Sequence, residues 1–281
     1  MSRPTTRAAR RSTAARGTHA ILMLGSILML VPFAWMLLTS VKTMSEAVAV
    51  PPVLFPAEPQ WGNYAYVFQL LDFGRLYVNT IVATVIRVAS QLVLCAMAGY
   101  AFARLSFPGK NLLFALVLSV MMIPPLMYVI PKFLLMTDFG WVNTAQGWIV
   151  PGLFSAFGTF VMRQFFLTLP RELHEAAKID GAGPFRTFFS IMLPLARSGL
   201  IALAIFVTLW SWNDFMWPLI VLNSPDKLPL SVGLAAMRGE HDTNFPAMMA
   251  GSVLAVLPML VLFFILQKRF IEGLAFTGSK L

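Results

Sequence analysis

Six long apolar segments run through this chain of 281 residues and limit the folds that it can adopt. They lie at about residues 20–41, 77–103, 111–131, 145–167, 198–222 and 246–267. A helix needs about 20 apolar residues to cross the core of a bilayer, and each segment is of this order. Since hydrocarbon offers the backbone no hydrogen-bond partner, a spanning segment of this kind is helical. The sequence therefore predicts an all-α, polytopic membrane protein with six transmembrane helices in a single transmembrane domain over residues 19–281.

The composition supports the same class of protein. Hydrophobic residues make up 58% of the chain and charged residues only 12%, whereas about 25% of the residues of an average soluble domain are charged. The ten-residue alternation of a membrane β-barrel is absent from the sequence.

The lysine and arginine residues fall unevenly on the two sides of these segments. With a cytoplasmic N-terminus, fifteen of the 21 lie on the cytoplasmic side, five lie outside and Arg87 lies within a span. The positive-inside rule then predicts a multi-pass protein of the cell membrane with both termini in the cytoplasm. The net charge of +9 is explained by this placement, so no nucleic-acid partner is expected.

Residues 1–18 are basic and polar, which predicts a disordered cytoplasmic tail facing anionic lipid. The alternative is a secretory signal with Ala47–Ala49 as its cleavage site. The tail is favoured, because the apolar run that follows it is about 20 residues long and signal peptides use about 7–15.

Residues 169–195 form a polar, charged loop between the fourth and fifth spans. Pro170 suits the first turn of a helix, and the run Gly181–Pro184 ends that helix and begins a second one. About ten residues at 1.5 Å each give about 15 Å, which is half of a bilayer core. We expect this first helix to lie outside the membrane and to present Ala176 and Ala177 for close contact with a soluble partner.

The second helix of the loop carries an apolar side. Phe185, Phe188, Phe189 and Met192 recur at helical spacing, whereas Arg186, Thr187 and Ser190 point elsewhere. We expect the apolar side to pack on the membrane helices.

Two charges inside the predicted spans need partners, because an isolated charge in the bilayer costs a few kcal/mol. Arg87 lies about ten residues from the outer end of the second span, and Asp214 lies about eight from the outer end of the fifth, which at 1.5 Å per residue gives similar depths. We predict that they approach each other or share an aqueous cavity.

Polar and aromatic residues accompany these charges. The second span carries a polar stripe at helical spacing that should face protein or a water path, and the segment around Asp214 combines indole rings with hydrogen-bonding groups, the chemistry that a sugar requires. The candidate translocation-path residues are Thr80, Thr84, Arg87, Gln91, Trp210, Asn213 and Asp214. The alternative is that these polar groups only tie helices together.

Catalytic and metal-binding patterns are missing from the sequence. Cys95 is the only cysteine, so no disulfide can form within the chain. His19, His174 and His241 lie far apart and lack metal-ligand spacing, and Gly109-Lys110 lacks the upstream glycine of a phosphate loop. We expect no metal, no cofactor and no enzymatic activity in this chain.

The charged loop resembles the loop that marks membrane permeases of ABC importers. The resemblance lies in Glu175-Ala176-Ala177, Asp180-Gly181-Ala182, Ile191 and Leu193-Pro194. Residues 130–152, 210–222 and 267–280 are similar to the carbohydrate-uptake branch of the same family. The chain departs from that pattern at Ser198, where a second proline is common, at Arg87, where a small or apolar residue is usual, and at Leu281, where glycine is frequent.

This resemblance implies a type I ABC importer permease fold and a set of partners. These are a second permease subunit, two ATPase subunits that bind ATP and Mg²⁺, and an external solute-binding protein. The residues that would couple to the ATPase are Glu175, Ala176, Ala177, Asp180, Gly181, Ala182, Ile191, Leu193 and Pro194. The expected substrate is a sugar or sugar derivative.

Other functions stay open at this stage. Within the family the solute could be an amino acid or a sugar phosphate, because the guanidinium of Arg87 would bind a phosphate if Asp214 did not neutralise it. Outside the family, the two charges could serve ion coupling in a secondary transporter, or the chain could be a scaffold without a substrate.

Overall fold

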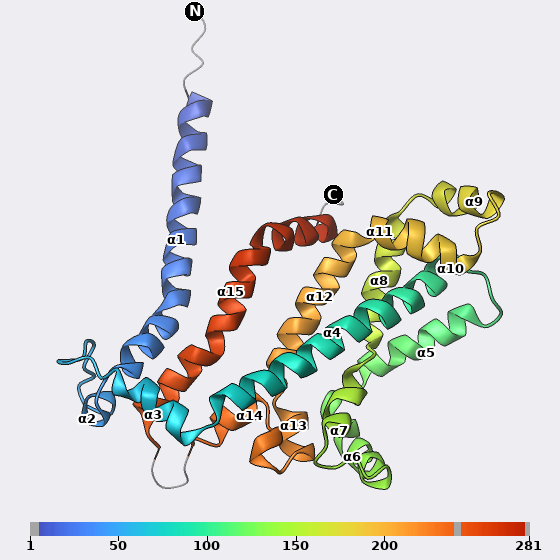
Figure 1. The fold of residues 1–281 in the computed structure, drawn as a ribbon. Coiled ribbons are helices and arrows are strands. Elements are labelled where there is room, and N and C mark those ends of the chain that lie inside the picture. Colours follow the sequence, from blue (N-terminus) through green and yellow to red (C-terminus); the bar gives the residue numbers. More distant parts are fainter. Residues whose placement is uncertain (1–5, 239–242, 279–281) are drawn as a thin grey trace, which may run out of the picture. The chain divides into compact units, whose positions relative to one another are not determined.

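The computed structural model describes residues 6–238 and 243–278, and every regular element in these ranges is a helix (Figure 1). The helices form two compact units. The first unit runs to Leu71 and includes Met237–Val256, and the second holds Asp72–Ala236 and the chain from Leu257. The prediction of an all-α protein is confirmed for the described residues.

Four continuous stretches of helix are long and apolar enough to cross a membrane: Ile21–Ser40, Phe73–Arg104, Ala145–Thr168 and Phe245–Gln267. Two bent pairs qualify as well, Lys110–Met122 with Pro125–Asp138 and Pro184–Leu195 with Arg197–Trp212. If each bent pair counts as one span, the described residues contain up to six spans. Five of them overlap the predicted segments, whereas the pair Pro184–Trp212 begins and ends earlier in the chain than the predicted segment 198–222.

The first unit contains α1 (Thr6–Ser40), α2 (Met44–Ala47), α3 (Gly62–Leu70) and the beginning of α15 (Phe245–Gly278). Helix α1 begins at Thr6, so residues 6–18 are helical where the sequence predicts disorder, and residues 1–5 lie outside the described residues. The alanines and arginines of this stretch have high helix propensity and extend the first span, which the polarity argument overlooked.

The turn after α1 is fixed by a buried lysine. The Lys42 ammonium donates a hydrogen bond to the carbonyl of Val53 at 2.6 Å and lies 4.1 Å from the centre of the Trp35 ring. Asn63 donates hydrogen bonds to the carbonyls of Ser40 and Lys42 from α3. The buried charge of Lys42 is therefore satisfied by one carbonyl oxygen and an aromatic face.

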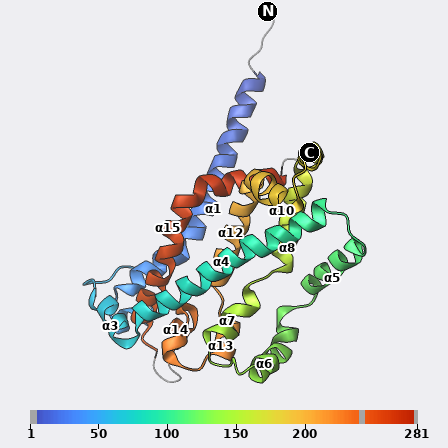
Figure 2. The same ribbon diagram turned by 45° about the vertical axis from the view of Figure 1, so that its right-hand side comes forward.

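The second unit is built on three helices, α4 (Phe73–Arg104), α8 (Ala156–Thr168) and α12 (Arg197–Trp212), which run side by side in Figures 1 and 2. Helices α4 and α8 approach closely at Gly99, where an added Cβ would lie 2.7 Å from the Arg163 backbone nitrogen. Their buried core includes Cys95, Phe166 and Leu203. Small residues allow this close packing, as is usual between membrane helices.

Prolines divide the third span. Helix α5 (Lys110–Met122) ends before Pro124, and a 3₁₀ turn (Pro125–Tyr128) leads into α6 (Val129–Asp138) after a bend of 98°. Ile123 has extended backbone angles, as expected for a residue that precedes a proline.

The fourth span is also interrupted. It consists of α7 (Ala145–Ile149), a 3₁₀ turn (Val150–Gly152) and α8, which is capped by the Ser155 side chain. At the break, the carbonyls of Trp148, Gly152 and Leu153 accept hydrogen bonds from side chains of α4.

The fifth span differs from its prediction. A continuous helix over 198–222 was expected, but α12 ends at Trp212 and α13 (Met216–Val221) begins after a break. Pro218 lies in the first turn of α13, where its missing N–H costs no helical hydrogen bond, so the chain restarts the helix just ahead of it. A 3₁₀ turn (Pro225–Lys227) and α14 (Leu230–Ala235) follow.

Candidate functional site

Arg87 and Asp214 form an ion pair inside the second unit. The Arg87 Nη1 atom lies 2.8 Å from Asp214 Oδ2, and the two side chains are 8% and 21% exposed. This confirms the prediction that the two charges approach each other. Because each neutralises the other, Arg87 no longer gives a reason to expect an anionic substrate.

The pair joins three separate parts of the fold. Arg87 on α4 also donates from Nη2 to the carbonyl of Trp148 at 2.7 Å, and the Trp148 indole N–H donates to Asp214 at 3.2 Å. The Asp214 carbonyl in turn accepts a hydrogen bond of 2.7 Å from Ser231 on α14. Arg87 and Asp214 therefore hold the breaks in the fourth and fifth spans against α4.

The polar stripe of α4 faces protein along its length. Thr80, Thr84, Arg87 and Gln91 are all buried. Thr84 donates to the Ser211 hydroxyl at 3.1 Å, and Gln91 donates to the carbonyl of Gly152 at 2.8 Å. Thr80 accepts a hydrogen bond from the Leu230 backbone at 2.8 Å. Each residue of the stripe thus hydrogen-bonds to a place where another helix ends, breaks or begins.

Two further candidate path residues lie on the surface of the second unit. Trp210 is 73% exposed, and Asn213 is exposed, with its amide donating to the Leu209 carbonyl at 2.8 Å. In contrast, the nearby Trp217 is buried and donates to the Gly147 carbonyl. The aromatic segment thus divides into an exposed and a buried part.

The charged loop begins with α9 (Arg171–Ile179), which Pro170 precedes as the residue at its N-terminal cap. After Asp180 the chain takes a left-handed conformation at Gly181, with φ of 77°. Gly181 then donates to the Lys178 carbonyl and Ala182 to the Ala177 carbonyl, the pair of hydrogen bonds that defines a Schellman cap. The Asp-Gly-Ala motif is therefore the stop signal of α9.

Within α9 the motif residues have different surroundings. Ala177 is buried, whereas Glu175, Ala176 and Asp180 are exposed. Leu173, one turn before Ala177 on the same helix, is 40% exposed. No other described residue covers Glu175, Ala176 and Asp180, so a partner protein could contact them.

The second part of the loop comprises α10 (Pro184–Thr187), a π-helical turn (Phe188–Met192) and α11 (Leu193–Leu195). Phe188 and Met192 pack in the core with Ile191 and Leu193 beside them, but Phe185 and Phe189 are 69% and 51% exposed. The expected single apolar side is therefore only half correct. The π turn hydrogen-bonds over five residues, so it rotates the side chains away from α-helical spacing, and it buries Thr187 instead.

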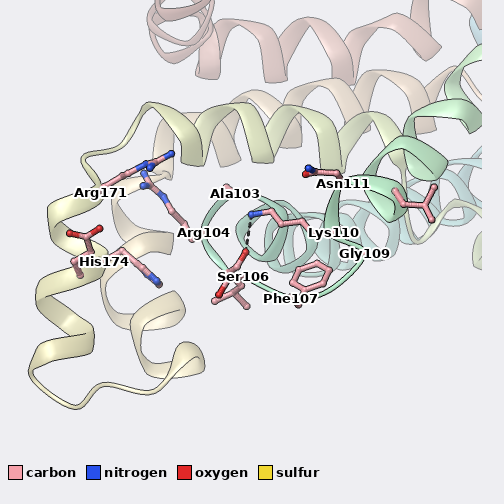
Figure 3. Close-up of a pocket in the computed structure, with 12 residues that line it drawn as sticks. Ala103, Arg104, Ser106, Phe107, Gly109, Lys110, Asn111, Arg171 and His174 are labelled. Atoms are coloured by element: carbon pink, nitrogen blue, oxygen red, sulfur yellow. Dashed lines mark hydrogen bonds between the residues drawn. The ribbon is translucent and has the colours of Figure 1, made fainter.

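A cavity of about 580 Å³ lies beside α9, between the end of α4 and the start of α5. Its lining includes Arg104, Lys110, Arg171, His174 and Glu175 (Figure 3). Burial and the nearby charges of Arg104 and Lys178 lower the pKa of His174, whose ring lies 3.3 Å from the Tyr100 hydroxyl. Sequence reasoning missed this cavity, although Arg104 and Lys110, at the facing ends of two consecutive helices, were a signal.

Other functional contacts were also invisible in the sequence. Arg87 and Gln91 bond to backbone carbonyls, which carry no residue-specific signal. Gly152 leaves room for Arg87, because a Cβ there would lie 2.7 Å from Arg87 Nε. Lys132 lies 3.6 Å from the centre of the Trp217 ring, a contact that joins α6 to α13.

Helices with broken spans, an internal ion pair and a long polar loop define a multi-pass membrane transport subunit. Residues 91–274 match the family described as binding-protein-dependent transport system inner membrane component. The chain belongs to this family of ABC importer permeases, which are transport subunits and not enzymes.

Individual relatives agree with this assignment. The chain is 35% identical to the diacetylchitobiose uptake system permease protein NgcG of Streptomyces coelicolor, over 93% of this chain and 87% of that protein. It is 36% identical to the arabinooligosaccharides transport system permease protein AraQ of Bacillus subtilis, over 92% and 93%.

The fold also matches a solved structure. This is the crystal structure of a bacterial ABC transporter involved in the import of the acidic polysaccharide alginate. The TM-score is 0.81, the match covers 96% of this chain and all of the other, and the sequences are 23% identical. The predicted permease fold is thereby confirmed.

Proposed function

We propose that this chain is the permease subunit of an importer for a sugar or sugar derivative, working with a second permease, two ATPase subunits that bind ATP and Mg²⁺, and an external solute-binding protein. The motif of residues 169–195, formed as a capped helix with Glu175, Ala176 and Asp180 exposed, carries the proposal. The printed names of the two permease relatives support the sugar class.

In this proposal both termini and residues 169–195 lie in the cytoplasm, as the lysine and arginine distribution favours. Closure of the ATPases on ATP would move α9 and, through Ile191, Leu193 and Pro194, the helix α12 that follows directly. The 78° bend before α12 supports this route, because a push on the loop acts on the end of the helix.

The same orientation defines the proposed path. Trp210 and Asn213 would offer a ring face and an amide to a sugar, since both are exposed. Thr80, Thr84, Arg87, Gln91 and Asp214 would form the wall that holds the broken helices behind them.

Glu175→Lys tests the coupling. Because the charge reversal falls on an exposed residue at the proposed ATPase contact, we expect sugar uptake to fall to background while the protein still inserts in the membrane. Uptake of labelled sugar and immunoblots of the membrane fraction are the measurements. Glu58→Lys, the same change on an exposed residue outside the loop, should leave uptake unchanged. Normal uptake by Glu175→Lys would contradict the coupling role.

The substrate class needs a separate experiment. Thermal-shift screening of the cognate solute-binding protein should show stabilisation by oligosaccharides such as diacetylchitobiose or arabino-oligosaccharides. Stabilisation only by amino acids would rule out the sugar class and leave the importer assignment intact.

A further inference from the structure

The cavity beside α9 is bordered by cationic side chains from two consecutive elements and the loop helix. Arg104 is the last residue of α4, Lys110 is the first of α5, and Arg171 is the first of α9. Figure 3 shows the guanidinium groups of Arg104 and Arg171 pointing toward each other. Two positive charges that face each other repel, and an anion placed between them would remove this repulsion.

No carboxylate in the described part of the chain forms an ion pair with any of these three cations. Among the described residues, Glu175 is the only acidic one that lines the cavity, and Glu172 is the one other carboxylate whose charge acts on Arg104. Arg163 adds a fourth positive charge close to Lys110, with its guanidinium 4.2 Å from the centre of the Phe114 ring. The cavity therefore carries an excess of positive charge.

Backbone contacts hold two of the cations in place. Arg104 donates from Nη2 to the carbonyls of Phe166 and Leu169, while its buried Nε has no partner among the described residues. Lys110 donates to the carbonyl of Leu105 at 2.8 Å. These contacts hold the Arg104 guanidinium and the Lys110 ammonium in position at the cavity, which lowers the entropic cost of binding an anion there.

The position of the cavity in the membrane indicates which anion it meets. The span Phe73–Arg104 ends at the cavity and the next span begins there at Lys110, so the cations lie at the depth of the lipid headgroups. Leu112, Leu116 and Val120 follow on α5 at helical spacing and are 66%, 55% and 52% exposed. A phosphate in the cavity would place its acyl chains along this apolar face.

We propose that the cavity binds the headgroup phosphate of an anionic phospholipid, held by Arg104, Lys110 and Arg171. Basic clusters at the cytoplasmic side of membrane helices favour anionic headgroups, and guanidinium groups bind phosphate through paired hydrogen bonds. The proposal rests on membrane insertion, which the family establishes, and not on the coupling role of Glu175. The site ties α9 to the ends of α4 and α5 through a lipid.

The test uses the complete transporter in nanodiscs of phosphatidylcholine with or without phosphatidylglycerol. Native mass spectrometry counts the phosphatidylglycerol molecules retained, and titration of spin-labelled phosphatidylglycerol gives an affinity. The double variant Lys110→Gln/Arg171→Gln removes two positive charges from the cavity. We expect it to weaken the retention of phosphatidylglycerol about 25-fold, or about 5-fold for each charge. Arg197→Gln is the matched control, because Arg197 is an exposed arginine that begins α12 outside the cavity.

The outcomes separate the possible occupants. Loss of phosphatidylglycerol in the double variant alone supports the proposal, and equal retention in all three proteins overturns it. Inorganic phosphate that competes with the labelled lipid at equal concentration overturns the lipid assignment in favour of a free anion. Unchanged lipid retention with loss of the ATPase subunits overturns it in favour of an acidic protein partner.

A folding defect is distinguished by the single variant Arg171→Gln. Among the described residues, the Arg171 side chain has no ion-pair or hydrogen-bond partner. The variant should therefore keep its melting temperature in phosphatidylcholine. Its affinity for the lipid should still fall about 5-fold. Wild-type affinity in a stable Arg171→Gln protein overturns the proposal.

Discussion

Two of the three arginines of helix α4 have opposite surroundings. Arg87, in the middle of the helix, has a carboxylate at 2.8 Å and a carbonyl at 2.7 Å, whereas Arg104, at the end, faces another arginine across a cavity. The difference follows from the surroundings. A charge within the hydrocarbon has to be neutralised by the protein itself, but a charge at the boundary can be left for a ligand, a lipid or a partner.

The largest effect should come from removing one half of the internal pair. Arg87→Met leaves the Asp214 carboxylate with the Trp148 indole as its remaining side-chain donor, so we expect a loss of about 3 kcal/mol in the free energy of unfolding. Thermal unfolding of the purified complex measures it. Arg87→Met/Asp214→Leu should recover most of the loss, because no unpaired charge remains. A single variant as stable as the wild type would remove the contrast between the two arginines.

A smaller effect is expected at the glycine that makes room for Arg87. In Gly152→Ala the new Cβ would lie 2.7 Å from Arg87 Nε, and Arg87 cannot retreat because Asp214 and Trp148 hold it. We expect a cost of about 1–3 kcal/mol in the same unfolding measurement.

The same substitution separates crowding from other causes. Gly152→Ala should be almost neutral in the Arg87→Met/Asp214→Leu background, since a double-mutant cycle reports only the shared contact. Gly62→Ala, where nothing lies within 4 Å of the added Cβ, is the control. An equal cost in both backgrounds would show that Arg87 is not held as tightly as the ion pair implies.

The smallest effect concerns pH at the cavity. The pKa of His174 is lowered, mainly by burial. The loop of residues 169–195 therefore binds fewer protons when it is packed on the helices than when it has opened away from them. The contribution of His174 is therefore full above its ordinary pKa of 6.5 and is lost as the pH falls below that value. Hydrogen exchange of the α9 amides, expressed at each pH relative to the intrinsic rate of an unprotected amide, should be faster at pH 5.5 than at pH 7.5.

The His174 variant and lipid provide the checks. His174→Gln should abolish the pH dependence of α9 exchange. Phosphatidylglycerol should weaken that dependence, since an anion in the cavity favours the protonated ring. Exchange that responds to pH equally with and without His174 would contradict the role of this residue.

Much of the fold follows from the pattern of polarity along the chain. Five of the six apolar segments, the helix that begins after Pro170 and its end near Gly181 are found where the sequence places them. The pairing of Arg87 with Asp214 was also predictable, because two opposite charges at similar depth have few other partners. These features depend on whether a segment needs an apolar environment, a helix end or an opposite charge, and the residue types of the segment show which of these it needs.

The details that the sequence left open depend on contacts between distant segments. The break after Trp212 and the π turn at Phe188–Met192 are stable because other helices pack against them. The predicted face of Phe185 and Phe189 was wrong for the same reason, since helical spacing describes an isolated helix. Backbone carbonyls gave no signal in the sequence at all.

The sequence by itself determined the class of this protein: a multi-pass membrane permease with a charged loop at residues 169–195 and two internal charges that require each other. Only the tertiary structure decided which groups meet those requirements. The Trp148 carbonyl lies 61 residues from Arg87 in the chain, and Asp214 lies 127 residues away. Hydrophobicity and helix signals act over a few residues, whereas satisfying a buried charge, or leaving a cluster of cations open at the boundary, depends on how whole helices pack.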